Sequence, residues 1–262
     1  MELPKVTPEQ RDAYARANPF PHAILHGIFP DAVLDGVLAE FPKSDEIDWI
    51  RFNNPTEKKL GFRVDNSIGG KTRAFLEYLN SAPVLRWLEA LTGIEGLIPD
   101  PYYQGGGLHQ IESGGFLKIH ADFNWHKKLE VHRRINLLVY LNKDWDEAYG
   151  GHLELWDREM RSCRHKILPS FGRCVVFNTT DFAFHGHPEP LQCPPDRSRK
   201  SIALYYYTSS RPRGELTEAH TTLFKKRHGE DWREKPGRRL EAVLSKLVPP
   251  IFGDFKRART KR

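Results

Sequence analysis

The chain has 262 residues, of which 39% are hydrophobic and 15 are phenylalanine, so it can form a substantial hydrophobic core. This length suits one domain with appendages, or at most two small domains. No apolar run approaches the ~20 residues that a membrane-spanning helix needs. The N-terminus also lacks the apolar stretch of a signal peptide. We therefore expect no membrane partner.

The cysteines and the charge indicate where the protein works. Cys163, Cys174 and Cys193 are an odd number without close spacing, which predicts unpaired thiols and a cytoplasmic location. Lys and Arg outnumber Asp and Glu by 13 to 5 over residues 221–262, although the net charge of the whole chain is only +6. A basic tail suits contact with nucleic acid, but a solvated basic helix explains it as well. We expect no nucleic-acid partner.

The first hundred residues are predicted to be mainly helical. Thr7 and Gln10 have the spacing of a capping box, which indicates a helix through Ala15. Residues 20–25 are typical of a strand, and residues 43–70 are polar and predicted to be irregular. Further helices are predicted from apolar residues at helical spacing, over 30–41, 72–80 and 83–93. Residues 1–104 should form a helical N-terminal support.

The pattern changes at Gly105-Gly106-Gly107. Short strands separated by turn residues then follow one another, with no helix between them, which predicts a β sandwich or barrel. The predicted strands span residues 108–112, 116–122, 135–142, 151–156, 164–168, 173–178 and 200–207. A helical stripe runs from Leu240 to Leu247. We expect one domain over 1–262, with a mainly β core at 105–210 and a basic helical C-terminal extension at 211–262.

The segment from Phe116 to Asp122 carries the first sign of chemistry. Its alternating apolar and polar residues predict a half-buried strand with His120 and Asp122 on the same face. A buried imidazole and carboxylate need a partner or a metal ion. His-x-Asp supplies two ligands of the facial triad, in which two histidines and one carboxylate leave coordination positions open on iron. The candidates for the second histidine are His126, His132, His152, His165, His185 and His187.

These candidates differ in their surroundings. His126 and His132 lie in a polar stretch and are expected at the surface, and His152 and His165 are also compatible with solvent. His185 follows a hydrophobic segment. His187 would share its face if the strand continued, although the Gly186 between them makes that continuation doubtful.

A cationic residue near the start of the last strand could bind an anionic cosubstrate. Arg199 and Ser201 share one face of that strand and offer a guanidinium and a hydroxyl group. A guanidinium binds a carboxylate through two parallel hydrogen bonds. Arg197 and Lys200 are competing candidates for this role.

The order His120-x-Asp122, His185, Arg199-x-Ser201 resembles the iron(II)/2-oxoglutarate-dependent oxygenases, and in particular their prolyl-hydroxylase-like branch. The segment from Tyr140 to Trp145, followed by Gly150-Gly151-x-Leu153, is similar to a segment of the hypoxia-sensing prolyl hydroxylases. Residues 19–42 resemble the N-terminal region of that branch more weakly. The resemblance implies a double-stranded β-helix, which is a jelly roll of the cupin kind.

The resemblance also implies roles for individual residues. His120, Asp122 and His185 match the iron ligands, and Arg199 with Tyr140 matches the site of the distal carboxylate of 2-oxoglutarate. Further cosubstrate contacts are expected from Leu138, Leu153, Ser201 and Gln110, of which Gln110 stands where the hypoxia-sensing enzymes have a tyrosine. His187 stands where the family often has valine, which leaves open which imidazole binds the metal.

The implied cofactors are Fe(II), 2-oxoglutarate and O2, with ascorbate as an optional addition. The expected reaction hydroxylates a substrate C–H bond and converts 2-oxoglutarate to succinate. The favoured substrate is a prolyl residue in a protein or peptide. The alternatives are a free amino acid or small metabolite, a noncatalytic cupin-like binding module, and a nucleic-acid demethylase, which is disfavoured. All motifs lie between residues 109 and 205, so residues 221–262 should be dispensable for iron and cosubstrate binding.

Overall fold

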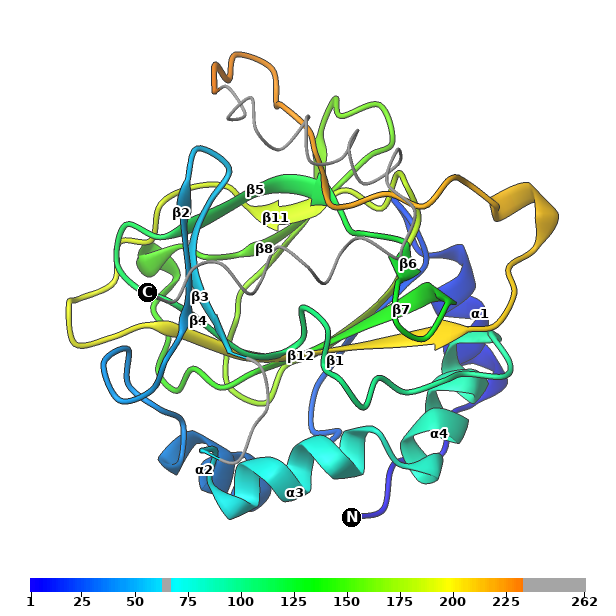
Figure 1. Ribbon diagram of the computed structural model, residues 1–262, viewed down its shortest axis with the longest axis horizontal. Coiled ribbons are helices and arrows are strands. Elements are labelled where there is room, and N and C mark those ends of the chain that lie inside the picture. The colour runs from blue at the N-terminus through cyan, green and yellow to red at the C-terminus, as the bar shows by residue number, and fades with distance from the viewer. Residues whose placement is uncertain (63–66, 233–262) are drawn as a thin grey trace, which may run out of the picture.

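A curled antiparallel sheet forms the centre of the protein, and four helices cover one side of it (Figure 1). The computed structural model describes residues 1–62 and 67–232. The helices are α1 (Pro8–Arg16), α2 (Asp31–Ala39), α3 (Gly70–Leu79) and α4 (Ala82–Thr92), with short 3-10 turns at Glu147–Tyr149 and Arg213–Glu215. The strands are β1 (His22–Leu25), β2 (Ile50–Asn54), β3 (Glu57–Phe62), β4 (Gly107–Ile111), β5 (Phe116–Ala121), β6 (Trp125–His126), β7 (Val131–Tyr140), β8 (Leu153–Trp156), β9 (Cys163–Ile167), β10 (Cys174–Asn178), β11 (His185–His187), β12 (Arg199–Thr208) and β13 (Leu223–Phe224).

The strand order is that of a jelly roll, as predicted. Hydrogen bonding connects the strands in the order β1-β10-β7-β12-β4-β3-β5-β11-β8-β9. One layer holds β10, β7, β12 and β4, and the opposite layer holds β5, β11, β8 and β9 (Figure 1). The chain crosses repeatedly between the two layers, so residues far apart in sequence face one another across the interior.

The helices bury the outer face of the β7–β12 layer. Their apolar residues, including Leu34, Leu76 and Leu88, form one cluster with Leu137 and Ile202 of the sheet. The predicted capping box is present at α1, where the Thr7 side chain accepts from the Gln10 backbone and the Gln10 side chain accepts from the Thr7 backbone. The helical support therefore fixes the position of the layer that carries Tyr140 and Arg199.

The prediction that residues 43–70 are irregular is wrong for residues 50–62. β2 and β3 form a hairpin there, and β3 pairs with both β4 and β5. The side chain of Asn54 closes the turn by accepting hydrogen bonds from Thr56 and from the backbone of Glu57. Backbone groups form this pairing, so the polar side-chain pattern of the hairpin does not reveal it.

The three cysteines are free thiols in the structure. Cys174 and Cys193 are buried, and burial raises the pKa of Cys174 to about 12. We predict that titration of the denatured protein without reductant will detect all three thiols, and that the native protein will react more slowly at Cys174 than at the partly exposed Cys163. A robust intramolecular disulfide in freshly purified protein would contradict this expectation.

Candidate metal centre

His120, Asp122 and His185 come together at the junction of β5 and β11. His120 and His185 are paired across these strands, and their ring centroids are 4.4 Å apart. The Nε2 atom of His120 lies 3.6 Å from Oδ1 of Asp122, and that of His185 lies 3.4 Å from Oδ2. All three residues are buried. The pairing of β11 with β5 thus brings together residues that are about 65 positions apart in sequence.

Both histidines are oriented by the backbone. Nδ1 of His120 is 2.8 Å from the carbonyl oxygen of Lys118, and Nδ1 of His185 is 2.9 Å from that of Ala183. A carbonyl can only accept, so each Nδ1 carries the proton and each Nε2 keeps its lone pair. Burial lowers the pKa of His185 to about 4, although the Asp122 carboxylate opposes this shift. His185 is therefore a neutral ligand at physiological pH.

Two side chains of β7 hold the carboxylate of Asp122. Nη2 of Arg133 donates to Oδ2 over 3.0 Å, and Nδ2 of Asn136 donates to the same oxygen over 2.6 Å. Arg133 is fully buried and its guanidinium lies over the Tyr205 ring. Burial alone would raise the pKa of Asp122, but Arg133, His185 and His120 hold it well below its ordinary value. The carboxylate is therefore ionised.

This donor set fits a divalent metal ion. One ligand atom from each of the three residues lies within 4.8 Å of the other two. Two imidazoles and one carboxylate suit Fe(II), and also Mn, Co, Ni or Zn. Hydrogen bonds to the far side of each ligand are typical of metal centres, because they fix the tautomer and the orientation.

A buried arginine lies on the inner face of β12. Arg199 is 4% exposed, its Nε donates to the carbonyl oxygen of Gly151 over 2.8 Å, and its Nη2 donates to the hydroxyl of Tyr140 over 3.2 Å. Among the described residues, no carboxylate pairs with it. Ser201 is buried on the same face and is paired with Tyr140. A buried cation without an anionic partner is costly. Arg199 with the hydroxyl groups of Tyr140 and Ser201, here called the Arg199 group, is therefore suited to bind an anion.

The other expected cosubstrate contacts are divided between the two faces of the sheet. Leu138 and Leu153 pack with Tyr140 on the inner face. Gln110 does not reach this group: it is paired with Lys200, and its side chain donates to Ser198 on the face that looks toward the helices. The next residue along, His109, is paired with Ser201 and takes the inner position. The prediction for Gln110 is corrected by this one-residue difference in register.

The remaining histidines are placed as follows. His126 is fully buried, not at the surface as expected, with its ring 5.2 Å from that of Tyr207 and its Nε2 3.3 Å from Asp100. The pairing of β6 with β7 turns this ring inward. The strand also continues through Gly186, so His187 is part of β11 and is buried. His132, His152 and His165 are partly exposed and do not belong to the metal cluster.

Arg133 and Asn136 are the site residues that the sequence reasoning missed. Asn136 shares its strand face with Leu138 and Tyr140, so the alternation of β7 contained a signal. Arg133 had no such signal, because a register shift between Tyr206 and Tyr207 breaks the alternation at this point of the β7–β12 ladder. Only the folded ladder brings its guanidinium to Asp122.

The segment after β12 lies against the metal ligands. β13 pairs with β5, with Phe224 opposite His120 and the two rings 5.5 Å apart. Lys118 forms an ion pair with Glu230 at 2.9 Å, and Asn124 bonds to Thr217. In Figure 1 this orange segment passes over β5. The described part of the C-terminal extension, which includes Phe224, therefore lines the site. The stripe from Leu240 to Leu247 lies outside the described residues.

These contacts predict different effects for two truncations. Deleting residues 233–262 should leave metal and 2-oxoglutarate affinity unchanged, since every contact above lies before that segment. Truncation after Arg213 should also remove the β13–β5 pairing and the burial of Phe224. We expect a loss of about 2 kcal/mol, or roughly 4–8 °C in melting temperature. Thermal melts and metal titrations of both proteins test this. Loss of cosubstrate affinity in a folded 1–232 protein would contradict it.

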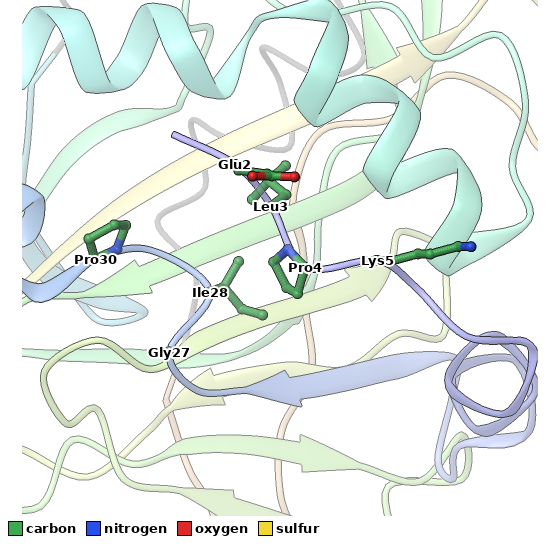
Figure 2. Close-up of a pocket in the computed structure, with 7 residues that line it drawn as sticks. All are labelled: Glu2, Leu3, Pro4, Lys5, Gly27, Ile28 and Pro30. Atoms are coloured by element: carbon green, nitrogen blue, oxygen red, sulfur yellow. The ribbon is translucent and has the colours of Figure 1, made fainter.

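A separate hollow lies near the N-terminus (Figure 2). It is lined by Glu2, Leu3, Pro4, Lys5, Gly27, Ile28 and Pro30. None of these residues belongs to the metal cluster, and Glu2 and Lys5 are exposed to solvent. The hollow is therefore distinct from the metal centre.

No helix among residues 1–62 and 67–232 is long and apolar enough to cross a membrane.

Comparison with known sequences finds a family match over the β core. Residues 106–207 match the sequence model of the 2OG-Fe(II) oxygenase superfamily. Prolyl 3-hydroxylase OGFOD1 of Mus musculus is 32% identical over 82 residues, which are 30% of this chain. That match spans only 15% of the length of the mouse protein.

Solved structures share the fold. A Pseudomonas putida prolyl-4-hydroxylase is 16% identical, with 76% of this chain and 97% of that chain covered and a TM-score of 0.53. A Trichoplax adhaerens prolyl hydroxylase, in complex with a hypoxia inducible factor peptide fragment, is 17% identical, with coverages of 76% and 90% and a TM-score of 0.52. HygX of Streptomyces hygroscopicus, with nickel and 2-oxoglutarate bound, is 10% identical, with coverages of 84% and 97% and a TM-score of 0.55. The core of the chain, residues 106–207, is similar to the 2OG-Fe(II) oxygenase superfamily, and the chain resembles the prolyl-hydroxylase-like branch of that superfamily.

Proposed function

We propose that this protein is an Fe(II)- and 2-oxoglutarate-dependent dioxygenase that hydroxylates a prolyl residue in a protein or peptide. The observation that carries the proposal is the arrangement of two histidine Nε2 atoms around the Asp122 carboxylate, in the same barrel as a buried guanidinium that is paired with no carboxylate of the described residues. Bound Fe(II) would supply O2 activation, with 2-oxoglutarate as the two-electron reductant that leaves as succinate and CO2.

The protein's own residues would bind and orient the reactants. His120, Asp122 and His185 would fill three positions of the metal and leave the others open. Arg133 and Asn136 would keep Asp122 ionised and fixed. A side chain that takes a proton from the substrate is not required, because the C–H bond is oxidised and not deprotonated.

The cosubstrate would lie between the metal and the inner face of β12. Arg199 and the hydroxyl groups of Tyr140 and Ser201 would bind its distal carboxylate. Leu138 and Leu153 would contact its apolar methylene groups and exclude water. We propose that residues 1–262 act as one oxygenase domain, since the helices and the β7–β12 layer share one hydrophobic cluster.

The similarity to a prolyl 3-hydroxylase supports a prolyl substrate. This similarity extends over 82 residues. Hydroxylation of a free amino acid or small metabolite would use the same contacts to the metal and to 2-oxoglutarate. A nonenzymatic binding module would bind the metal and 2-oxoglutarate without turnover.

The test is succinate release with candidate substrates. The Fe(II)-loaded protein should be incubated with 2-oxoglutarate, O2 and ascorbate, together with proline-containing peptides or with free amino acids. Succinate formation coupled to the mass gain of one oxygen atom on a prolyl residue is the expected result. Coupled turnover with free amino acids only would replace the prolyl substrate by a metabolite. Binding of 2-oxoglutarate without succinate release under any condition would overturn the enzymatic assignment.

A further inference from the structure

His187 is a buried histidine that belongs neither to the metal cluster nor to the Arg199 group. It is 3% exposed, and neither of its ring nitrogens has a hydrogen-bond partner among the described residues. Buried polar side chains are nearly always hydrogen-bonded, so two unpartnered nitrogens on one ring need an explanation. A ligand that binds next to the ring would supply the missing partner.

The ring faces the interior of the barrel. In the ladder between β11 and β8, His185 is opposite the inner residue Leu155, and Gly186 is opposite Glu154. The ladder between β11 and β5 has a register shift between His185 and His187, so the position of the His187 ring is given by the groups near it and not by alternation. The titratable groups around it are Arg199, Lys59, His120 and His109. His187 therefore borders both the metal ligand His120 and the Arg199 group.

A charge count indicates what His187 can contribute. A divalent metal ion, the Asp122 carboxylate and the Arg133 guanidinium paired with it carry a net charge of +2, and Arg199 adds another positive charge. Together they exceed the two negative charges of 2-oxoglutarate. Lys59 is already paired with Glu57 at 3.3 Å. No further cation is needed, so a neutral imidazole that donates one N–H suits this position.

We propose that His187 donates a hydrogen bond from its ring to an oxygen of bound 2-oxoglutarate, in addition to the Arg199–Tyr140 contact. This inference rests on the proposed function. It makes His187 a cosubstrate-binding residue, not a metal ligand, in agreement with its absence from the metal cluster. The hydrogen bond would also satisfy one of the two buried ring nitrogens.

Cosubstrate affinity and metal content, measured in the same proteins, test this inference. The proteins are the wild type, His187→Phe, which keeps a ring without nitrogens, His187→Gln, which keeps an N–H donor, and His187→Leu in case the larger ring prevents folding. His126→Gln is a matched control, because His126 is also buried but contacts Tyr207 and Asp100. Each protein is loaded with Fe(II) without oxygen and titrated with 2-oxoglutarate, with the metal-to-ligand absorption band as the readout.

We expect His187→Phe or His187→Leu to raise the dissociation constant of 2-oxoglutarate about tenfold, which corresponds to one lost hydrogen bond. One metal ion per chain should remain bound. His187→Gln should recover part of the affinity, and His126→Gln should match the wild type. Such a pattern would not follow from a purely structural role, which would change thermal stability without a selective loss of cosubstrate affinity.

Two results would overturn the inference. Wild-type affinity for 2-oxoglutarate in a folded, metal-loaded His187→Phe or His187→Leu protein would show that the ring makes no such contact. Loss of the metal from these variants would show that the ring acts at the metal instead. Failure of the wild-type protein itself to bind 2-oxoglutarate would count against the proposed function, so the two failures are distinguishable.

Discussion

Single replacement of His120, Asp122 or His185 by alanine should abolish tight binding of one metal ion per chain. Each residue supplies one of the three ligand atoms that the cluster brings together within residues 1–62 and 67–232, and these atoms lie within 4.8 Å of one another. Removal of a residue that merely supports a ligand typically weakens metal binding by about 10–100-fold. Loss of a ligand should therefore exceed that range. Equilibrium dialysis without oxygen, followed by metal quantification, measures the effect with Fe(II), Mn(II) and Ni(II).

His187→Ala is the decisive control, because His187 is the same kind of residue on the same strand. It should retain one metal ion per chain. Full metal affinity in His185→Ala together with loss of the metal in His187→Ala would exchange the assignment of these two histidines. Circular dichroism of each variant separates loss of the metal from loss of the fold.

The removal of a ligand also affects the residues behind it. In Asp122→Ala, the buried Arg133 guanidinium would lose its carboxylate partner. An uncompensated buried charge is strongly destabilising. Asp122→Asn keeps an oxygen near Arg133 and is the better variant for a metal measurement in a folded protein.

Local patterns made the centre of the site predictable. The alternation over residues 116–122 placed His120 and Asp122 on one face, and the structure brings both side chains into the metal cluster, although Ile119 and Ala121 on the opposite face are buried as well. His185 was identified by its place in the order of motifs. Its selection over His187 needed the β11–β5 pairing, which is a contact between distant segments.

The errors have a common physical origin in long-range pairing. The β2–β3 hairpin is stabilised by pairing with β4 and β5, and its polar sequence carries no amphipathic signal. The choice between Gln110 and His109 depended on which residue of β4 is opposite Ser201. A one-residue shift reverses the face of a side chain, and an isolated short strand does not fix its register. Phe224 reaches His120 for the same reason, through a strand pairing that only the fold creates.

Burial and strand face distinguish Arg199 from its two competitors, Arg197 and Lys200. Arg197 is only partly buried and donates to the backbone carbonyl oxygens of Lys143 and Asp144. Lys200 points to the opposite face of β12, where its Nζ contacts Ser198. Arg199 alone among these three is buried on the inner face beside Tyr140. Arg197→Ala and Lys200→Ala are therefore matched controls for the loss of a nearby positive charge.

Arg199→Ala should weaken 2-oxoglutarate binding by about one to several orders of magnitude, because each charged hydrogen bond contributes roughly 1.5–3 kcal/mol. Arg199→Lys should be intermediate, since it keeps the charge but loses the planar fork. Tyr140→Phe should have a smaller effect, since it removes one neutral hydroxyl group. Titration of the Fe(II) protein without oxygen, followed through the metal-to-ligand absorption band, gives the dissociation constants. Equal affinity in Arg199→Ala and the wild type would contradict the assignment, and if Arg197→Ala and Lys200→Ala also bind normally, the proposal of a 2-oxoglutarate enzyme fails with it.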